Sequence, residues 1–324
     1  MKVIKRKVLQ NIESNTKYYA CTFYPQSKKY FVQNSYFDNC SFRNNVYFES
    51  LKKCTFDNCG FCEHASLSLS KMNIRSFPKY ICHFTFLSHL DLSGNKFELL
   101  PCLEQLSNLK HLIAPSSPNN HFHDLPNFPQ SVLKLKNLES LTISNVCGCP
   151  AQLAQLKNLR YLNIREAQLQ MFPWTLLNLH NLTHLCLSST DIKSIPTEIR
   201  ELHNLTHLDL GCNNLSLLPL GIFELRNLQY LGLRSNDIIE IPDHISMLTS
   251  LRYLDFSFNC ISGVSRSIEK LCHLQKLLIS NNNLSWWKRQ CLKSWLKNCK
   301  IHDNSHYMPN LDEEYRTEAF KVLD

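Results

Sequence analysis

A period of 23 residues dominates the second half of this 324-residue chain. A motif that follows the pattern LxxLxLxxN, in which x is any residue, recurs six times in succession at that spacing, with substitutions at its later positions. Its opening leucines are Leu159, Leu182, Leu205, Leu228, Leu251 and Leu274. Repetition at this length indicates one supersecondary unit stacked on copies of itself, so the chain is predicted to fold as a solenoid.

The spacing inside each repeat predicts its local structure. Leu208 and Leu210 alternate as in a strand, whereas Leu218, Ile222 and Leu225 follow helical spacing. Each repeat is therefore expected to contain a short strand, a turn, and a short helix or irregular segment. Because one such unit cannot bury its apolar face alone, the leucines of neighbouring repeats are expected to join in a single core.

An asparagine follows the strand in the regular repeats. At that turn its amide can bond the exposed backbone of adjacent repeats, so a ladder of asparagines is predicted. The ladder residues are Asn213, Asn236, Asn259 and Asn282, whereas four earlier turns have Met72, Val146, Ala167 and Thr190 at this position. The ladder is therefore expected to be regular in the second half and broken in the first.

Weaker copies extend the repeats toward the N-terminus. The first recognisable turn contains Leu67, which gives about ten turns between residues 65 and 284. The interval from Leu109 to Leu138 is 29 residues instead of 23, and the additional residues fall at 115–128. Since this segment is rich in Pro, Asn and His, it is predicted to be a loop.

These repeats resemble the leucine-rich repeat family. The pairs Ile195-Pro196 and Ile241-Pro242, with Leu218-Pro219, are similar to the intracellular 23-residue class found in Ras-suppressor-type scaffolds. Similar repeats also occur in effectors that intracellular bacteria deliver into host cells. The resemblance implies an α/β fold, a curved horseshoe-shaped solenoid with a parallel β-sheet on its concave side and short helices or irregular segments on its convex side. It also implies protein binding, without naming the partner.

Residues 1–64 show a different periodicity. Large apolar residues lie five apart, and small residues precede several of them by two positions. The large residues are Phe37, Phe42, Tyr47, Leu51, Phe56 and Phe61, and the small ones are Ser35, Cys40, Cys54 and Cys59. This segment resembles a pentapeptide-repeat β-helix. We interpret it as a short β-helical cap over the first leucine repeat, because the ends of a solenoid need covering.

A structural zinc site is the alternative interpretation of this segment. Cys54, Cys59, Cys62 and His64 offer the thiolates and imidazole that zinc prefers. However, the spacing lacks two CxxC pairs, and the five-residue period already explains two of these cysteines.

Residues 285–300 are predicted to form an amphipathic capping helix. Its apolar stripe consists of Trp287, Cys291, Leu292, Trp295 and Leu296, and basic residues take the other face. Basic amphipathic helices also bind membranes or calmodulin-like proteins, but we favour capping because the helix directly follows the last repeat. Residues 301–324 are interpreted as an acidic helical tail that either folds back on the basic helix or docks elsewhere.

Cysteine usage and hydropathy suggest an intracellular protein. Fifteen cysteines are an odd number, and many fall at repeat positions rather than in clusters, which favours a reduced compartment. No apolar run has the length of a signal peptide or of an integral membrane segment. We expect a cytoplasmic location, which would be the host cytoplasm if the chain is a bacterial effector.

The functional surface can be predicted from the strands. Residues between the leucines of each strand point away from the core, toward the concave face. Tyr and His with scattered Arg and Asp are the residue types that anchor protein interfaces. The candidate partner-binding residues are Tyr161, Arg165, His184, His207, Asp209, Tyr230, Arg234, Tyr253 and Asp255.

A metal site is the alternative for part of this face. His184, Cys186, His207 and Asp209 would lie on one patch of adjacent strands, within reach of a metal ion. The string HNLTHL occurs twice, at 180–185 and 203–208, which suggests that the histidines belong to the repeat consensus. We therefore predict neither a metal nor a cofactor.

Catalytic motifs are missing from the sequence. There is no glycine-rich phosphate loop, no GxSxG and no HExxH. The net charge is +8, but the basic residues gather near the two ends rather than along one groove, so no nucleic acid is expected. The sequence predicts a monomeric, non-enzymatic interaction module. The alternative is a regulatory or adaptor subunit, or a bacterial effector, that recruits a client to an enzyme.

Overall fold

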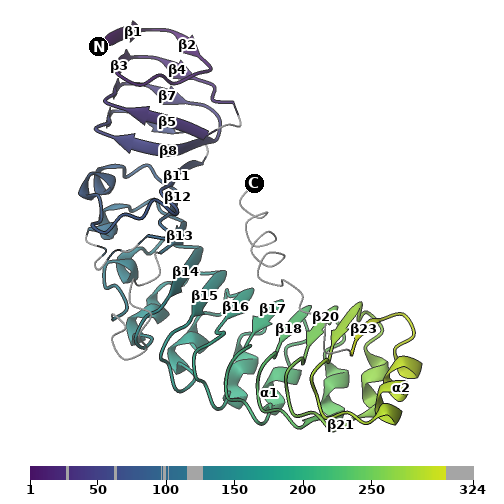
Figure 1. The fold of residues 1–324 in the computed structure, drawn as a ribbon. Coiled ribbons are helices and arrows are strands. Elements are labelled where there is room, and N and C mark those ends of the chain that lie inside the picture. Colours follow the sequence, from purple (N-terminus) through teal and green to yellow (C-terminus); the bar gives the residue numbers. More distant parts are fainter. Residues whose placement is uncertain are drawn as a thin grey trace. The chain divides into compact units, whose positions relative to one another are not determined.

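The computed structural model describes residues 1–303 except 27–28, 62–63, 96, 98–99, 101 and 115–126. The chain divides into two compact units, Met1–Asn158 (unit 1) and Leu159–Asp324 (unit 2) (Figure 1). Most of the predicted 115–128 loop, Cys62 of the alternative zinc site, and nearly all of the predicted acidic tail lie outside the described residues. The predicted domain boundaries after residues 64, 284 and 300 stay predictions.

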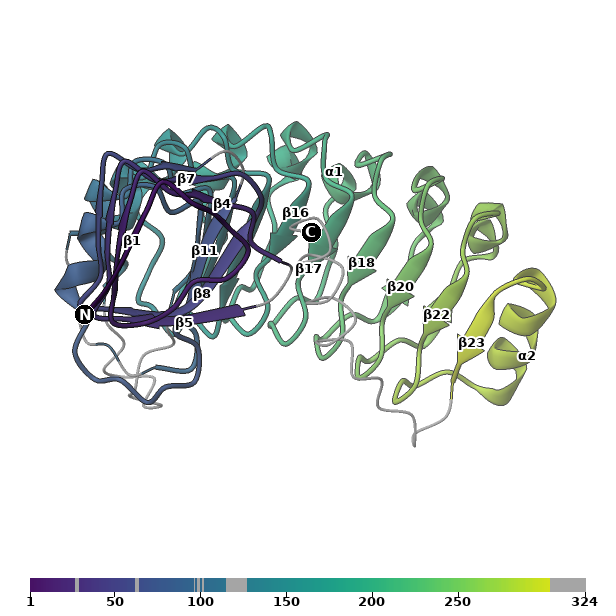
Figure 2. The same cartoon turned by 90° about the horizontal axis from the view of Figure 1, so that it is seen from above.

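Unit 1 begins with short parallel strands that wind around a common interior (Figure 2). One sheet has the order β1-β3-β6-β9 and the other β10-β7-β4-β2. Their bounds are β1 (Lys2–Lys5), β2 (Val8–Leu9), β3 (Thr16–Tyr19), β4 (Thr22–Phe23), β6 (Tyr36–Asp38), β7 (Ser41–Phe42), β9 (Thr55–Asp57) and β10 (Gly60–Phe61). We call residues 2–61 the N-terminal coils.

The interior of the N-terminal coils is built from stacked aromatic rings. Lys17 pairs with Tyr36, and Tyr36 with Thr55, so successive coils are offset by 19 residues. That offset places Phe37 between Tyr18 and Phe56, with ring centroids 4.9 and 4.5 Å apart. A second stack consists of Phe23, Phe42 and Phe61, with spacings of 4.8 and 4.5 Å.

The five-residue pattern describes these coils incompletely. Phe37, Phe42 and Leu51 are buried as expected, whereas Tyr47, Phe56 and Phe61 are only half-buried. For Tyr47 the reason is that β8 (Val46–Lys52) alternates and points Val46 and Phe48 inward. The coils also begin at the first strand, earlier than the predicted copies. The resemblance to pentapeptide repeats stays a prediction.

The rest of unit 1 is a parallel sheet with short helical segments. The strand order is β5-β8-β11-β12-β13-β14. The further strands are β5 (Lys29–Gln33), β11 (Ala65–Ser68), β12 (His89–Asp91), β13 (His111–Ile113) and β14 (Ser140–Ser144), and the 3-10 helices are η1 (Lys79–His83), η2 (Leu103–Gln105), η4 (Val132–Lys134) and η5 (Ala151–Gln155).

A disulfide joins Cys82 in η1 to Cys102, which precedes η2. Their Cα atoms are 6.0 Å apart. The sequence did not predict this bond, because the two cysteines lie 20 residues apart and only the fold brings them together. Since disulfides persist mainly in oxidising compartments, this pair weakens the case for a reduced one.

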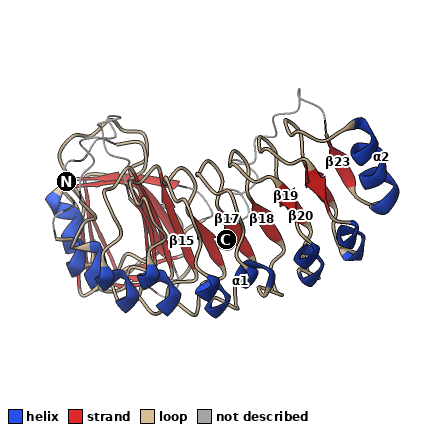
Figure 3. Cartoon of the chain, turned by 90° about the horizontal axis from the view of Figure 1, so that it is seen from below, coloured by secondary structure: helices blue, strands red, loops and turns tan. Residues whose placement is uncertain are grey.

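Unit 2 is a leucine-rich repeat solenoid with a parallel sheet in the order β15-β16-β17-β18-β20-β22-β23. In Figure 3 its helical segments lie on the side opposite the strands, which confirms the predicted α/β arrangement. The strands are β15 (Tyr161–Arg165), β16 (His184–Cys186), β17 (His207–Asp209), β18 (Tyr230–Gly232), β20 (Tyr253–Asp255), β22 (Lys276–Leu278) and β23 (Lys300–His302), with a small outer pair β19 (Glu240–Ile241) and β21 (Gly263–Val264). The helices are η6 (Trp174–Asn178), η7 (Thr197–Glu201), α1 (Leu220–Phe223), η8 (Asp243–Met247), η9 (Arg266–Lys270) and α2 (Trp286–Trp295).

The asparagine ladder is confirmed. Asn236 Nδ2 donates to the carbonyls of Leu210 (3.0 Å) and Leu233 (3.1 Å), while its Oδ1 accepts from Leu215 N (3.0 Å). Asn213, Asn259 and Asn282 make equivalent bonds. Thr190 continues the ladder with a shorter side chain, because its hydroxyl donates to the carbonyl of Leu187 and lies 3.0 Å from Asn213 Oδ1.

One contact between neighbouring repeats is unusually close. Gly221 in α1 lies against Thr197, and a Cβ added at Gly221 would be 1.8 Å from the Thr197 carbonyl oxygen. The equivalent position in the adjacent repeats is Glu198 or His244. Only a residue without a side chain permits this approach of the two backbones.

The C-terminal end of unit 2 departs from the prediction in two ways. Helix α2 ends at Trp295 rather than near residue 300, and β23 then pairs with β22 as a further parallel strand. Leu292 and Leu296 are buried as expected, but Trp287 is 68% exposed. At 3.6 residues per turn Trp287 points about 140° away from Leu292, so the two residues cannot share one apolar stripe.

No helix in the described part of the chain has the length and hydropathy needed to cross a bilayer.

Candidate protein-binding face

The open face of the unit 2 sheet presents two columns of side chains. Strand register aligns the first column, and the second lies two residues farther along each strand. The first column is Tyr161, His184, His207, Tyr230, Tyr253 and Lys276, and the second is Asn163, Cys186, Asp209, Gly232, Asp255 and Leu278. We call these two columns together the sheet face.

Aromatic rings form a row along the first column. The centroids of His184 and His207 are 4.2 Å apart with nearly parallel planes. Tyr161 lies 5.8 Å from His184, and Tyr230 lies 6.1 Å from His207. The parallel register of adjacent strands therefore places four predicted partner-binding residues side by side.

Threonine hydroxyls orient the two histidines. Thr183 Oγ1 donates to the Arg160 carbonyl and lies 2.9 Å from His184 Nδ1. Thr206 Oγ1 donates to the Thr183 carbonyl and lies 2.9 Å from His207 Nδ1. Each hydroxyl therefore holds the neighbouring imidazole ring through its Nδ1 atom.

The histidines are uncharged at neutral pH. Burial lowers the pKa of His184 to about 4. Burial, with a smaller contribution from the nearby His184, lowers the pKa of His207 to about 3. The middle of the first column is therefore a neutral aromatic surface.

The second column contains two aspartates separated by a glycine. Asp209 Oδ1 accepts from Gly211 N (3.0 Å), and its Oδ2 lies 3.6 Å from the donating Cys186 thiol. A Cβ on Gly232 would be 2.7 Å from Asp209 Oδ1 and 3.0 Å from the ring of Tyr230. The glycine thus leaves the room that these two side chains occupy.

Asp255 is the most unusual residue of the face. It is 2% exposed, and its Oδ1 accepts from Ser257 N (2.8 Å) and Ser257 Oγ (2.5 Å). Its Oδ2 is buried and has no hydrogen-bond partner among the described residues. Burial is the largest effect on its carboxyl group and raises its pKa.

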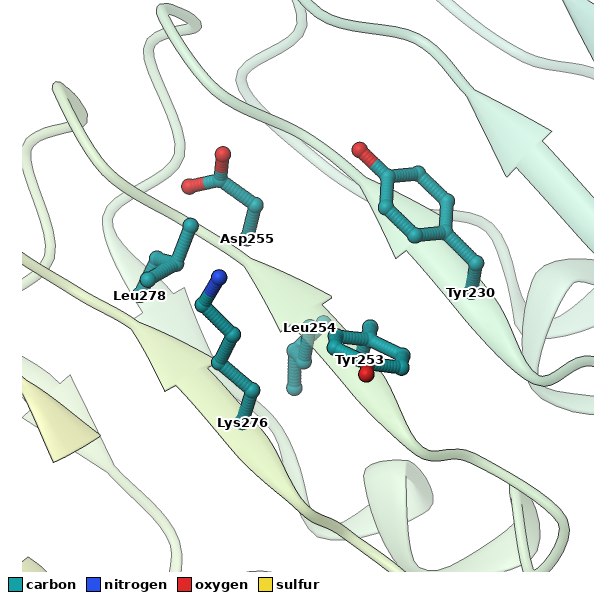
Figure 4. Close-up of a pocket in the computed structure, with 6 residues that line it drawn as sticks. All are labelled: Tyr230, Tyr253, Leu254, Asp255, Lys276 and Leu278. Atoms are coloured by element: carbon teal, nitrogen blue, oxygen red, sulfur yellow. The ribbon is translucent and has the colours of Figure 1, made fainter. Parts of the chain in front are cut away.

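A shallow hollow lies beside Asp255 (Figure 4). Tyr230 and Tyr253 line one side, and Lys276 extends its side chain along the other. Leu254 and Leu278 complete the lining. An acidic group, an ammonium group and two phenols therefore converge on one small area.

The two candidate arginines are held at the strand ends. Arg165 Nε donates to Asn163 Oδ1 (3.2 Å). The guanidinium carbon of Arg234 lies 4.8 Å from the centroid of the Phe258 ring, a cation–π distance. Phe258 was not predicted. It follows β20 in the turn, and its position three residues after Asp255 is the only signal that the sequence offers.

All nine predicted site residues lie in unit 2, but they differ in accessibility. Tyr253 is 38% exposed, whereas Tyr230 is 8% exposed and Asp255 2%. The other six are half-buried. Lys276 and Leu278 line the hollow without having been among the nine, although they occupy the same two positions in the next repeat.

The described residues contain no group of three or more His, Cys, Asp or Glu side chains placed to hold a metal ion. In the alternative zinc segment, the Cys54 thiol donates to the Val32 carbonyl and the Cys59 thiol to the Phe37 carbonyl. The thiols of Cys54 and Cys59 therefore donate hydrogen bonds to backbone carbonyls.

Comparison with known families supports this fold. The family model described as "Leucine-rich repeat region" matches residues 174–304, and the one described as "Leucine Rich Repeat" matches residues 86–114. This chain is a leucine-rich repeat protein. No curated protein sequence matches this leucine-rich repeat protein.

Solved structures of other leucine-rich repeat proteins share the fold at low sequence identity. A leucine-rich repeat protein of Leptospira interrogans is 22% identical, with a TM-score of 0.57 over 85% of this chain and 89% of that chain. An internalin of Listeria monocytogenes is 16% identical, with a TM-score of 0.51 over 84% and 82%. The plant peptide hormone receptor RGFR1, in complex with RGF2, is 20% identical, with a TM-score of 0.58 over 94% of this chain and 52% of that one.

Proposed function

We propose that this leucine-rich repeat protein is a non-enzymatic interaction module that binds a protein partner on the sheet face of unit 2. The observation that carries the proposal is the row of rings from Tyr161 to Tyr230 beside the hollow at Asp255. Membership of the family supports an interaction role, since stacked repeats present long surfaces to partners.

The residue chemistry of the face suits a protein ligand. Aromatic rings held by neighbouring strands offer large contact area with little loss of side-chain entropy on binding. Adjacent strands repeat this chemistry about every 4.8 Å, which suits an extended partner surface. Tyr253 and Lys276 are the accessible residues nearest the hollow, so we place the centre of the interface there.

The buried residues contribute by shaping the face. Tyr230 and Asp255 offer little surface of their own, and Gly232 leaves space between Tyr230 and Asp209. The neutral histidines add aromatic surface without adding charge. The proposal therefore assigns direct contact to Tyr253, Lys276 and the half-buried histidines, and a supporting role to Tyr230 and Asp255.

We also propose that the protein is a cytoplasmic monomer of the intracellular repeat class. We propose that it binds no nucleic acid. Among the described residues twelve cysteines are free thiols, and free thiols favour a reducing location such as the cytoplasm. The disulfide at Cys82 favours an oxidising one, but it involves only two cysteines.

Affinity purification from a cell lysate with mass spectrometry tests the binding face. The variant Tyr253→Ala/His207→Ala/Lys276→Ala removes accessible groups of the first column. The control Leu217→Ala/Leu220→Ala removes two apolar side chains, 69% and 52% exposed, in and beside α1. Partners retained by the native chain and the control but lost from the first variant would support the proposal. Partners that survive in both variants, with circular dichroism unchanged, would place the binding surface elsewhere.

A further inference from the structure

Helix α2 carries two adjacent tryptophans that the repeat core does not use. Trp286 is 69% exposed and Trp287 68%, and their ring centroids are 6.2 Å apart. On the same helix Leu292 is 1% exposed. Large aromatic side chains left side by side in water form an exposed apolar patch, and such patches mark interaction surfaces.

The geometry of α2 fixes the outward direction of the pair. At 3.6 residues per turn, Trp286 and Trp287 lie about 120° and 140° around the helix from Leu292, on opposite sides of it. The Ser285 side chain caps the helix by accepting from Lys288 N (3.3 Å). The first turn is therefore anchored, and the tryptophans point away from the last repeat.

The segment around the pair is uniformly basic. Residues 285–302 contain Lys288, Arg289, Lys293, Lys297 and Lys300 and no acidic residue. Arg289 Nε donates to the Leu284 carbonyl (3.2 Å), and Lys293 pairs with Asp303 (3.0 Å). Within the described residues no carboxylate pairs with the other three lysines. A positive field thus surrounds an apolar patch.

We propose that α2 is a peripheral membrane-docking surface, on which Trp286 and Trp287 enter the interface of a bilayer rich in anionic phospholipid. Tryptophan favours that interface, because its ring is apolar while its indole N–H can reach water or a headgroup. Lys288 and Lys297 supply attraction to anionic headgroups. A second copy of this chain is a poorer occupant, because it would bring a like-charged surface against the first.

This site is separate from the sheet face and goes beyond the proposed protein-binding function. The residues of α2 contribute neither to the two columns nor to the hollow at Asp255. Membrane docking and partner binding can therefore be tested independently of each other.

Vesicle co-sedimentation of the full chain tests the proposal. The probes are vesicles of phosphatidylcholine alone and vesicles that also contain about one-third phosphatidylserine. We expect at least about tenfold stronger partition onto the anionic vesicles at low salt, weakening as salt is raised. Trp286→Ala/Trp287→Ala should lose most of this binding. Trp174→Ala is the matched control, because Trp174 is also 57% exposed but lies on η6, and it should bind like the native chain.

A second variant separates charge from apolar insertion. Lys288→Gln/Lys297→Gln should abolish the preference for anionic vesicles. A measurement that needs no change at the site uses the Trp174→Ala chain with lipids brominated in the acyl chains, whose bromines quench nearby indoles. We expect quenching and a blue shift of the emission.

Three results would overturn the proposal. They are unquenched emission with brominated vesicles, equal partition of the native chain and the double tryptophan variant, and absence of sedimentation with either vesicle. If the native chain instead self-associates in sedimentation equilibrium and the double tryptophan variant does not, α2 is an interface between copies of this chain.

Discussion

The N-terminal coils of unit 1 and the repeats of unit 2 close a parallel turn with the same backbone conformation but different side chains. In both, a residue with positive φ follows a strand, such as Asn39 (+52°) in the coils and Ser235 (+53°) in the repeats. Each donates its N–H to the next turn, Asn39 to Asp57 and Ser235 to Ser257. The left-handed corner is therefore common to both regions.

The regions differ in the residue after the corner. In the coils it is small, as in Ser35 and Cys40, and its hydroxyl or thiol donates to a carbonyl two residues back. In the repeats it is asparagine, whose amide both donates and accepts across two repeats. A 19-residue coil leaves little backbone unpaired, whereas a 23-residue repeat has a longer turn with more groups to satisfy. The cysteines of the coils thus have a structural role.

The cores of the two regions also contain different kinds of side chain. The coils stack aromatic rings in two columns, and the repeats stack leucines.

The largest expected effect on this comparison comes from Phe37→Ala, which removes the middle ring of one stack. We expect a loss of about 3–5 kcal/mol in the free energy of unfolding, because the cavity cannot be filled by the rigid neighbouring rings. Urea unfolding followed by circular dichroism measures it. Phe31→Ala, at a residue 58% exposed, should have little effect.

Removal of one ladder rung should have the next largest effect. Asn236→Ala leaves the Leu215 N–H without its partner at a buried site, and it removes one of the two amide donors from each of the Leu210 and Leu233 carbonyls. We expect a loss of about 2–3 kcal/mol in the free energy of unfolding. Asn227→Ala is the control, since that side chain is exposed and donates to the His203 carbonyl. Equal losses in the two variants would mean that the ladder is not what holds the longer turns.

The histidines of unit 2 should make its stability depend on pH. The folded-state pKa values of His184 and His207, about 4 and about 3, lie below the ordinary value near 6.5. The unfolded chain therefore gains protons first as the pH falls, so stability is present above about pH 6.5 and is lost progressively toward pH 4. We expect a loss on the order of 1 kcal/mol, since the rings are partly solvated. His184→Gln/His207→Gln should flatten this part of the stability profile, and an unchanged profile would contradict the assignment.

The smallest effect tests the cysteine position of the coils. Cys40→Ala removes a weak thiol donor whose Sγ lies 3.4 Å from the Asp38 carbonyl. A loss of roughly 0.5–1 kcal/mol is expected, well below that of Asn236→Ala, because a thiol is a poor hydrogen-bond donor. A loss as large as that of the asparagine would show that the two corners depend equally on their side chains. Thermal unfolding of both variants in reducing buffer provides the measurement.

Much of unit 2 could be predicted because its structure repeats. The leucine spacing placed β16, β17 and β18 in register, and the asparagines lie where a turn needs an amide. The coils were predicted less well because a five-residue pattern does not specify a 19-residue coil. Tyr47 was therefore predicted to face the interior, whereas Phe48 is the residue that does so. The orientation of Trp287 was also predicted wrongly. The predicted apolar stripe grouped residues that lie far apart around the helix.

The candidate face was predictable in position but not in burial. Alternation along each strand identified both columns, including His207 and Asp209. The burial of Asp255 depends on Tyr230, Tyr253 and Lys276 from three adjacent strands. The burial of such a side chain arises from contacts between repeats. The pattern of a single repeat does not contain these contacts.

The close approach at Gly221 limits how this solenoid can be rearranged. Its repeats look alike, and a chain of this kind might be supposed to tolerate exchange, deletion or duplication of whole modules. However, any module with Glu, His or Thr at the position of Gly221 would bring a Cβ onto the Thr197 carbonyl. The repeat at α1 is therefore specific to its neighbour, and an engineer who shuffles these modules would have to move 197–223 as one block.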